Sequence, residues 1–338
     1  MATKISFFEV TEKEKIAFER YFHGPKYSLS FHHEKIEEVE AYLYNDSDII
    51  SVFNSSRIDS HVLNHMPKLK FIAVRATGVD NIDLKNCKKR GIAVSNVPGY
   101  GKTTVAEYAI MLMLMVFHKM PMVEEAVRSG RVDYRKLTGH TLNGKNLGII
   151  GAGRIGTSVA RIAKAMGMHV TAYDPFPNEI AAEQIGYSYT KLDDLLRGAD
   201  IVSIHATLNP SSAHMINKET LKMMNPDAIL INTARGGIVS TPDLISALKI
   251  GEIAGAALDC IEGEQTIDVE VETDLLLGKN SAEYSIAEVD VLSKMKNVIL
   301  SPHNAFNSAE ALYILRKTTA QNIHCFISKN PRNLIKLN

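Results

Sequence analysis

The amino-acid sequence predicts an α/β protein with two domains, each built on a doubly wound parallel sheet, and a cleft between them. A chain of 338 residues is too long for one ordinary hydrophobic core, and its length suits two domains of roughly 100 to 200 residues each. Short β-branched or apolar runs alternate with helix-like segments, and this alternation is typical of parallel β-α-β units. The runs fall into two series with a long apolar helix-like segment between them, so we expect two separate sheets.

The first series of runs predicts a small α/β domain at the N-terminal end. Pro98 and Gly99 then mark a turn or hinge. Residues 102–120 follow as one long helix, because they contain no internal glycine or proline. The strands expected in this domain are residues 5–10, 49–54, 71–76 and 92–96.

The second series predicts a larger sheet of buried parallel strands, because each run is short and almost wholly apolar. Pro302 ends the last run, and we expect the amphipathic helix at residues 309–328 to return to the first domain. This predicts a discontinuous small domain, residues 1–99 and 304–338, beside a larger domain, residues 100–303, with polar residues 128–145 as an exposed arm. The strands expected in the larger domain are residues 146–150, 170–173, 201–205, 229–232, 255–259 and 298–300.

The charges, the cysteines and the apolar runs exclude several classes of partner. Lysine plus arginine and aspartate plus glutamate both number 38, so long-range attraction favours neither nucleic acid nor a membrane surface. Cys87, Cys260 and Cys325 are far apart and lack metal-ligand spacing, which favours reduced thiols in the cytoplasm over disulfides or a metal site. The N-terminal residues turn charged before a signal-type apolar stretch develops. The most apolar run, 109–117, is shorter than the roughly 20 residues of a membrane span.

A glycine motif marks the start of the second series. The strand predicted over residues 146–150 leads into Gly-Ala-Gly-Arg-Ile-Gly, and a helix is expected over residues 157–166. Between a strand and a helix, the three glycines allow a tight turn, close approach of a pyrophosphate and close helix packing. The helix N-terminus then offers unpaired amides to the phosphates. The motif therefore predicts a Rossmann-type dinucleotide-binding domain, with the cofactor against Gly151, Gly153, Arg154, Ile155 and Gly156.

An acid at the end of the following strand predicts which dinucleotide binds. Asp174 lies 18 residues after Gly156, where the adenosine ribose is expected. A carboxylate there accepts hydrogen bonds from both ribose hydroxyls and repels a 2′-phosphate, so NAD is favoured over NADP. Taken alone, Asp174 is equally a turn former before Pro175, but the glycine motif upstream favours the cofactor role.

Polar side chains also follow later strands of the second series, where ligands of open α/β sheets bind. Arg235 precedes two glycines, and its planar fork suits a carboxylate. Asp259, Glu262 and Glu264 follow the next run, and His303 follows the last one. Each is most often a solvated or structural residue when taken singly. Their shared place on successive strand ends predicts one reactive site.

Several motifs in one order resemble the D-isomer-specific 2-hydroxyacid dehydrogenases, and within that family the D-lactate dehydrogenase branch. The resemblance covers nearly the whole chain and implies a Rossmann-type NAD domain beside a smaller flavodoxin-like catalytic domain. It also implies a catalytic set of Arg, Glu and His, which falls on Arg235, Glu264 and His303. The motifs are residues 77–83, 95–100, 151–156, 232–236, 258–259 and 301–303.

The resemblance further implies residues around the substrate and the cofactor. Backbone amides of Thr77 and Gly78 would help to bind the substrate carboxylate, with Tyr100 close by. It implies that Asp259 lies near the nicotinamide. Along the rest of the nucleotide it implies contacts from Ala206, Thr207, Thr233 and Ala234. Thr207 stands where relatives commonly carry proline.

The chemistry implied is the reduction of a 2-keto acid. Arg235 would bind its carboxylate and polarise the keto oxygen, and protonated His303 would donate a proton to that oxygen. Glu264 would stabilise the charged imidazole, because a carboxylate about 4 Å away attracts it by roughly 4 kcal/mol before desolvation is subtracted. Even a third of this attraction raises a pKa by about one unit.

Some residues depart from the family's pattern. Gln265 follows Glu264 where many relatives have proline, and the acid-rich segment 268–290 comes next. The choice between Glu264 and Glu262 as the catalytic acid therefore stays open. The residues after His303, Asn304 to Phe306, lack the Ala-Gly that hydroxypyruvate and phosphoglycerate relatives carry there. Phe306 would close over a short, methyl-type side chain.

These inferences favour an NAD-dependent enzyme that reduces pyruvate to D-lactate. A bulkier 2-keto acid, of the hydroxyisocaproate type, stays open, and Phe53 is a candidate for setting that size limit. From another class, a non-enzymatic NAD-sensing scaffold has no chemical need for three catalytic residues. A formate-dehydrogenase-like role would require glutamine instead of the glutamate partner. The family also implies a homodimer, with residues 120–145 as its arm.

Overall fold

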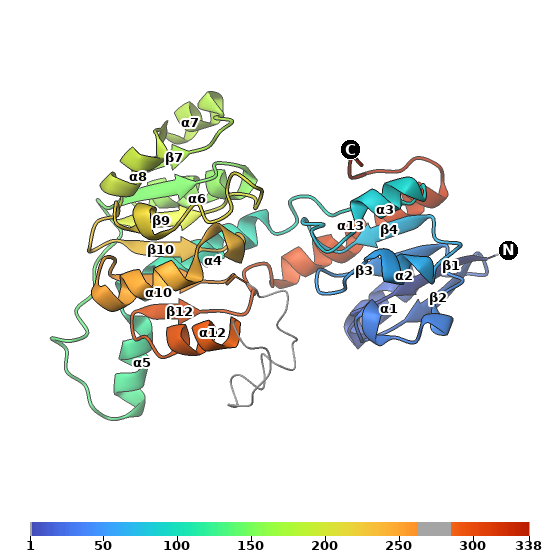
Figure 1. The fold of residues 1–338 in the computed structure, drawn as a ribbon, viewed down its shortest axis with the longest axis horizontal. Coiled ribbons are helices and arrows are strands. Elements are labelled where there is room, and N and C mark those ends of the chain that lie inside the picture. Colours follow the sequence, from blue (N-terminus) through green and yellow to red (C-terminus); the bar gives the residue numbers. More distant parts are fainter. Residues whose placement is uncertain (1, 263–284, 338) are drawn as a thin grey trace. The chain divides into compact units, whose positions relative to one another are not determined.

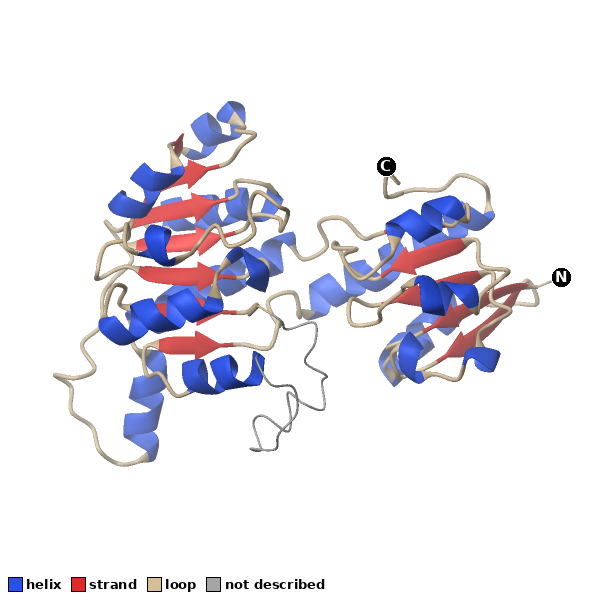
Figure 2. Cartoon of the chain, in the orientation of Figure 1, coloured by secondary structure: helices blue, strands red, loops and turns tan. Residues whose placement is uncertain are grey.

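The computed structural model describes residues 2–262 and 285–337, and the chain divides into two compact units (Figure 1). Unit 1 comprises Met1–Tyr100 with Ser308–Asn338, and unit 2 comprises Gly101–Asn307. Each carries a parallel sheet with helices on both faces (Figure 2). The predicted fold class, α/β with two parallel sheets, is therefore confirmed. No helix in the described ranges is both long enough and apolar enough to cross a membrane.

Unit 1 is built on a five-stranded parallel sheet. In spatial order its strands are β2 (Tyr27–Phe31), β1 (Thr3–Phe7), β3 (Ile49–Val52), β4 (Phe71–Val74) and β5 (Ala93–Ser95). Its helices are α1 (Glu12–Tyr21), α2 (Ser60–Asn64), α3 (Leu84–Lys89) and α13 (Ala309–Ile327), with two short 3-10 helices, η1 (Ile36–Glu38) and η2 (Ala41–Leu43).

Both faces of this sheet are covered. Strands β3 and β4 are buried at every residue, which explains why they are continuous rather than alternating apolar runs. One face packs against α1 and α13 through Phe18 and Ile323, and the other against α2 and α3 through Leu63 and Cys87. The C-terminal helix α13 thus completes the core of unit 1.

Strand β2 was not among the strands predicted from the sequence. Its residues read Tyr-Ser-Leu-Ser-Phe, and it lies at the edge of the sheet, mostly half-buried. An edge strand with serines at alternate positions lacks the continuous apolar run that identified β3 and β4. Its parallel pairing with β1 was therefore decided by tertiary packing.

Unit 2 is built on a seven-stranded parallel sheet. In spatial order its strands are β12 (Val298–Leu300), β11 (Gly255–Leu258), β10 (Ile229–Asn232), β9 (Ile201–Ile204), β6 (Asn146–Ile150), β7 (His169–Tyr173) and β8 (Ser188–Tyr189). Its helices are α4 (Lys102–Phe117), α5 (Met120–Arg128), α6 (Arg154–Ala165), α7 (Glu179–Ile185), α8 (Leu192–Gly198), α9 (Lys218–Leu221), α10 (Thr241–Ile250) and α12 (Ser285–Ser293), with the 3-10 helix η3 (Gly236–Ile238).

The strand order of unit 2 determines where a ligand can bind. The chain winds outward from β6 in one direction through β7 and β8, and from the neighbouring β9 in the other direction through β10, β11 and β12. Helices α4, α6 and α7 pack on one face, and α8, α9, α10 and α12 on the other. The carboxyl ends of β6 and β9 therefore meet at a topological switch point, where open α/β sheets bind ligands.

The single helix predicted over residues 102–120 is wrong. Helix α4 ends at Phe117, Lys119 has a left-handed φ of 52°, and α5 starts at Met120 with a proline in its first turn. The carbonyl of Phe117 accepts a hydrogen bond of 2.9 Å from the amide of His140. Gly139 is packed so close that a Cβ there would lie 2.4 Å from that carbonyl. A contact made by a distant loop therefore ends the helix.

Candidate active site

The glycine motif forms the turn from β6 into α6. Gly151 has a φ of +92°, and a Cβ on it would lie 2.6 Å from the amide nitrogen of Ala206. A Cβ on Gly156 would lie 2.1 Å from the carbonyl oxygen of Gly151. Gly153 differs, because a Cβ there would meet nothing within 4 Å. Two glycines thus permit close packing, and the third leaves open space at the N-terminus of α6, where Arg154 begins the helix.

Asp174 lies just past β7, beside this turn. One carboxylate oxygen accepts a hydrogen bond of 2.8 Å from the amide of Ala152, and the other accepts one of 2.9 Å from the amide of Phe176. The acid is therefore held against the glycine turn. Because each carboxylate oxygen has two lone pairs, both can still accept from another donor.

The described residues of this region fit a dinucleotide. The open space at Gly153 lies at the start of a helix of 12 residues, where backbone amides favour phosphate. At the end of β10, the hydroxyl of Thr233 is buried and has no hydrogen-bond partner among the described residues, which is costly unless a ligand supplies one. Next to Ala206, burial lowers the pKa of His205 to about 4, so that its imidazole is neutral at pH 7. Thr207 follows at the surface.

Arg235 follows β10 in a turn that other polar groups shape. The side chain of Asn232 accepts from the amide of Ala234 at 3.1 Å and donates to the carbonyl of Arg235 at 3.0 Å. The guanidinium of Arg235 donates to the carbonyl of Ala234 at 2.8 Å. A Cβ on Gly236 would lie 2.0 Å from the carbonyl carbon of Ile261. The turn that carries Arg235 is thus packed directly against the segment that follows β11.

His303 is held by a loop that is organised around Asp259. The Asp259 side chain is 1% exposed, and it accepts hydrogen bonds from the hydroxyl of Ser301 and from the amides of Asn304 (2.8 Å) and Ala305 (2.9 Å). The amide of His303 donates to the main-chain carbonyl of Asp259 at 2.9 Å. With a φ of +47°, His303 has a backbone conformation that non-glycine residues rarely adopt.

The family resemblance implies a place beside the nicotinamide for Asp259, and its bracing of the histidine loop was not predicted. Its bonding partners lie 42 to 46 residues away in the chain. The only local signal was an acid directly after a buried strand, which does not reveal its partners. Phe306 belongs to the same segment, and a Cβ on Gly101 would lie 3.8 Å from its Cβ atom.

Of the two candidate acids after β11, only Glu262 lies within the described residues. One oxygen of Glu262 pairs with the imidazole of His214, and the other accepts from the amide of Thr241 at 3.4 Å. His214 itself has a left-handed φ of 48°. Glu264 lies outside the described residues. The carboxylate of Glu262 is therefore already bound to a histidine other than His303.

In unit 1, Thr77 and Gly78 follow β4. The hydroxyl of Thr77 donates to the carbonyl of Val97 at 3.0 Å, and the side-chain amide of Asn96 donates to the carbonyl of Thr77 at 2.6 Å. Among residues 2–262 and 285–337, the backbone N–H groups of Thr77 and Gly78 have no acceptor. Two amide donors at a strand's carboxyl end are thus available to an anion. Tyr100 is the last residue of the first segment of unit 1.

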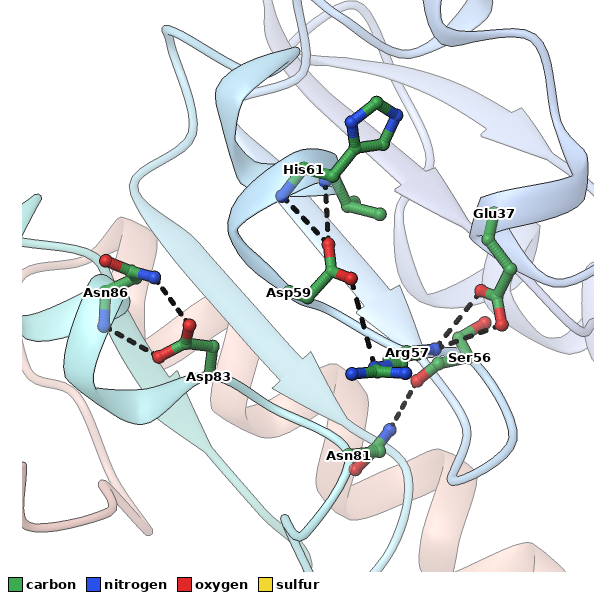
Figure 3. Close-up of polar contacts among 9 residues, drawn as sticks. Glu37, Ser56, Arg57, Asp59, His61, Asn81, Asp83 and Asn86 are labelled. Atoms are coloured by element: carbon green, nitrogen blue, oxygen red, sulfur yellow. Dashed lines mark hydrogen bonds and ion pairs between the residues drawn. The ribbon is translucent and has the colours of Figure 1, made fainter. Parts of the chain in front are cut away.

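The far end of this loop is held by Asn81 (Figure 3). Its side-chain amide donates to the carbonyl of Ser56 at 2.7 Å and to that of Phe53 at 3.0 Å. The carboxylate of Glu9 accepts from the amides of the same two residues, at 3.2 and 2.9 Å. The loop after β3 is therefore fastened to the loop after β4. Asn81 is part of a motif quoted above, but its bracing role was not predicted.

Comparisons with known proteins agree with this architecture. The family model described as "D-isomer specific 2-hydroxyacid dehydrogenase, NAD binding domain" matches residues 110–305. A glyoxylate reductase of Thermococcus litoralis is 37% identical over 310 residues, covering 89% of this chain and 85% of the relative. The D-lactate dehydrogenase of Escherichia coli is 30% identical over 325 residues, covering 95% of both chains.

Solved structures extend the likeness to the fold. The crystal structure of a D-lactate dehydrogenase from Aquifex aeolicus, complexed with NAD and lactic acid, superposes with a TM-score of 0.87. Its sequence is 30% identical, and the match covers 96% of each chain. The chain therefore belongs to the D-isomer-specific 2-hydroxyacid dehydrogenases, an NAD-dependent family of oxidoreductases that act on 2-hydroxy acids, and it carries their NAD-binding domain.

Proposed function

We propose that the protein is a D-lactate dehydrogenase, which reduces pyruvate to D-lactate with NADH in the cytoplasm. The observation that carries the proposal is the pair formed by Arg235 and His303. They follow β10 and β12, the two neighbours of β11 in one sheet, and Asp259 at the end of β11 holds the histidine loop. A guanidinium and an imidazole that are carried by hydrogen-bonded turns at the carboxyl ends of strands in one sheet suit the binding and protonation of a 2-keto acid.

In this proposal each side chain has a distinct role. Arg235 binds the substrate carboxylate and polarises the keto oxygen. NADH, when bound, supplies the hydride. His303 in its protonated form donates to the keto oxygen, and Glu264 stabilises that protonated form. Gly153, Arg154 and Ile155 would hold the pyrophosphate, and the remaining nucleotide contacts would come from Asp174, Ala206, Thr207, Thr233 and Ala234.

We assign the two domains to the two ligands. Residues 100–303 would form the NAD domain, and residues 1–99 with 304–338 the substrate domain. In the latter, the amides of Thr77 and Gly78 would receive the substrate carboxylate, because they have no acceptor among the described residues. Tyr100 would lie beside that carboxylate. Phe53 and Phe306 would limit the size of the substrate's side chain.

We also propose that the protein is a homodimer in which α4 and α5 form the interface. Helix α5 has no buried residue, although its sequence is amphipathic. A groove at its start is lined mostly by apolar side chains, with two polar residues among them: Ile110, Met111, Leu114, Met115, Met120 and Ile162, together with Glu107 and His118. Val127 and Tyr134 are 68% and 82% exposed. Exposed apolar side chains of this kind are typical of a surface that a second copy covers.

A panel of 2-keto acids tests the proposed activity. With NADH we expect pyruvate to be turned over with a kcat/KM at least about tenfold above that of 2-ketoisocaproate, because in this proposal aromatic side chains limit the length of the substrate's side chain. Glyoxylate belongs in the panel, as do NADPH controls. The product of pyruvate should be D-lactate on a chiral column, and exclusive formation of L-lactate would refute the proposal.

The panel also separates the alternatives. A higher kcat/KM for 2-ketoisocaproate than for pyruvate would favour a dehydrogenase for bulkier substrates. Binding of NADH without turnover of any 2-keto acid would favour a sensing scaffold. Turnover with NADPH as fast as with NADH would contradict the role given to Asp174.

Paired substitutions distinguish the two candidate acids. Replacing Glu264 by glutamine should remove the carboxylate that stabilises imidazolium, so the pKa of His303 falls. Pyruvate reduction needs the protonated form, and its alkaline limit should therefore move to lower pH by about one unit. Glu262→Gln should leave that limit in place, since Glu262 pairs with His214. A shift in the Glu262 variant alone would reverse the assignment.

A further inference from the structure

A buried asparagine in unit 1 is joined through hydrogen bonds to the loop that carries Thr77. Asn322 lies on α13 and is 2% exposed. Its side-chain nitrogen donates to the main-chain carbonyl of Asn96 at 2.8 Å. Its side-chain oxygen accepts from the side-chain amide of Asn333 at 2.8 Å. Both ends of the buried amide are therefore satisfied, one by a segment 226 residues away and the other by a residue 11 positions further along the chain.

Asn96 passes this connection on to Thr77. Its side-chain nitrogen donates to the Thr77 carbonyl at 2.6 Å, while its own amide donates to the carbonyl of Asn333 at 3.2 Å. The next residue, Val97, donates its amide to the carbonyl of Ala76 at 2.9 Å and accepts from the Thr77 hydroxyl at 3.0 Å. The position of Thr77 is thus determined largely by the place of the 96–97 peptide, which Asn322 holds.

The surroundings of Asn322 indicate that the amide is kept for a geometric purpose. Its neighbours on α13, Ala320 and Ile323, are buried in the apolar core of unit 1. Burying an amide in such a place is costly unless every hydrogen bond is made. An apolar side chain of similar size would fill the volume without that cost, but it would leave the Asn96 carbonyl without its donor.

We propose that Asn322 is a positioning residue for the substrate carboxylate. By holding Asn96, it sets the orientation of Thr77 and Gly78, whose N–H groups lack an acceptor among the described residues. The inference rests on the proposed function, in which these two amides receive the carboxylate. Asn81 fixes the other end of the same loop (Figure 3), so displacement at Thr77 would change the angle between the two donors.

The first test is the kinetics of Asn322→Ala in the full-length protein. We expect KM for pyruvate to rise about five- to tenfold with kcat changed less than about twofold, because a loop that binds substrate and transition state alike contributes uniform binding. The Kd of NADH, measured by fluorescence titration, should be unchanged. A KM within twofold of wild type would overturn the proposal.

Thr319→Val is the matched control for loss of a buried polar group on the same helix. Thr319 is fully buried one turn before Asn322, and its hydroxyl donates only to the carbonyl of Leu315, within α13. It should lower the melting temperature and leave KM unchanged. If both variants raise KM equally, the effect of Asn322→Ala is general destabilisation and the proposal fails.

A second pair of variants tests the route and avoids the risk that Asn322→Ala does not fold. Asn333→Gly removes the exposed partner of Asn322 and keeps a backbone that tolerates the φ of 52° found there; its KM should rise in the same direction by a smaller factor. In a cycle with Asn96→Ala, which removes the side-chain part of the route, the Asn322→Ala effect on KM should become smaller. Additive effects would contradict a shared route.

A wild-type protein inactive on all 2-keto acids would refute the proposed function instead.

Discussion

Replacing Arg235 by lysine is expected to lower kcat/KM for pyruvate by about a hundredfold or more, which corresponds to roughly 3 kcal/mol of lost transition-state stabilisation. Lysine keeps the charge but loses the planar pair of donors that binds a carboxylate and reaches the keto oxygen. The affinity for NADH should change little. Steady-state kinetics and a fluorescence titration of NADH measure the two effects separately.

The matched control is Arg161→Lys, an exposed arginine on α6 in the same unit. It makes the same chemical change away from the strand ends and should leave kcat/KM within about twofold, as surface substitutions usually do. Activity of Arg235→Lys close to that of the control would contradict the proposed carboxylate clamp.

Asp259→Asn is expected to lower kcat by at least about a hundredfold and the free energy of unfolding by about 2 to 4 kcal/mol. The carboxylate of Asp259 accepts from a hydroxyl and two backbone amides of the histidine loop. An asparagine side chain has one acceptor oxygen, and its NH2 group would face donors instead of acceptors. The loop would then no longer hold His303 in its left-handed conformation.

Asp200→Asn serves as the control for Asp259→Asn. Asp200 directly precedes β9 and so lies at the amino ends of the strands, opposite to the carboxyl ends that carry Asp259. Its carboxylate accepts a hydrogen bond of 2.8 Å from the amide of Asn146. This variant should lower the melting temperature while kcat stays within about twofold. Should Asp259→Asn also keep its kcat while losing stability, the acid would serve the fold alone, and its link to His303 would be wrong.

The family resemblance and the fold class could be predicted from the sequence because both depend on local patterns. Buried strands such as β3, β4 and β10 are continuous apolar runs, and their ends were located to within two residues. The glycine motif between β6 and α6 needs no distant residue to be recognised. Edge strand β2 and the break after Phe117 were missed, since packing and a contact from residues 139–140 decide them.

The sequence by itself determined which side chains follow which strand, and so it identified Arg235 and His303 as candidates at the ends of two strands of one series. Only the tertiary structure decided which distant groups bind one another: Asp259 braces the histidine loop, Glu262 pairs with His214, and Asn322 reaches Thr77 through Asn96. The physical reason is how far apart in the sequence the interacting residues are. Strands and glycine turns follow from neighbouring residues, whereas a buried hydrogen bond depends on which distant segments the folded core brings together.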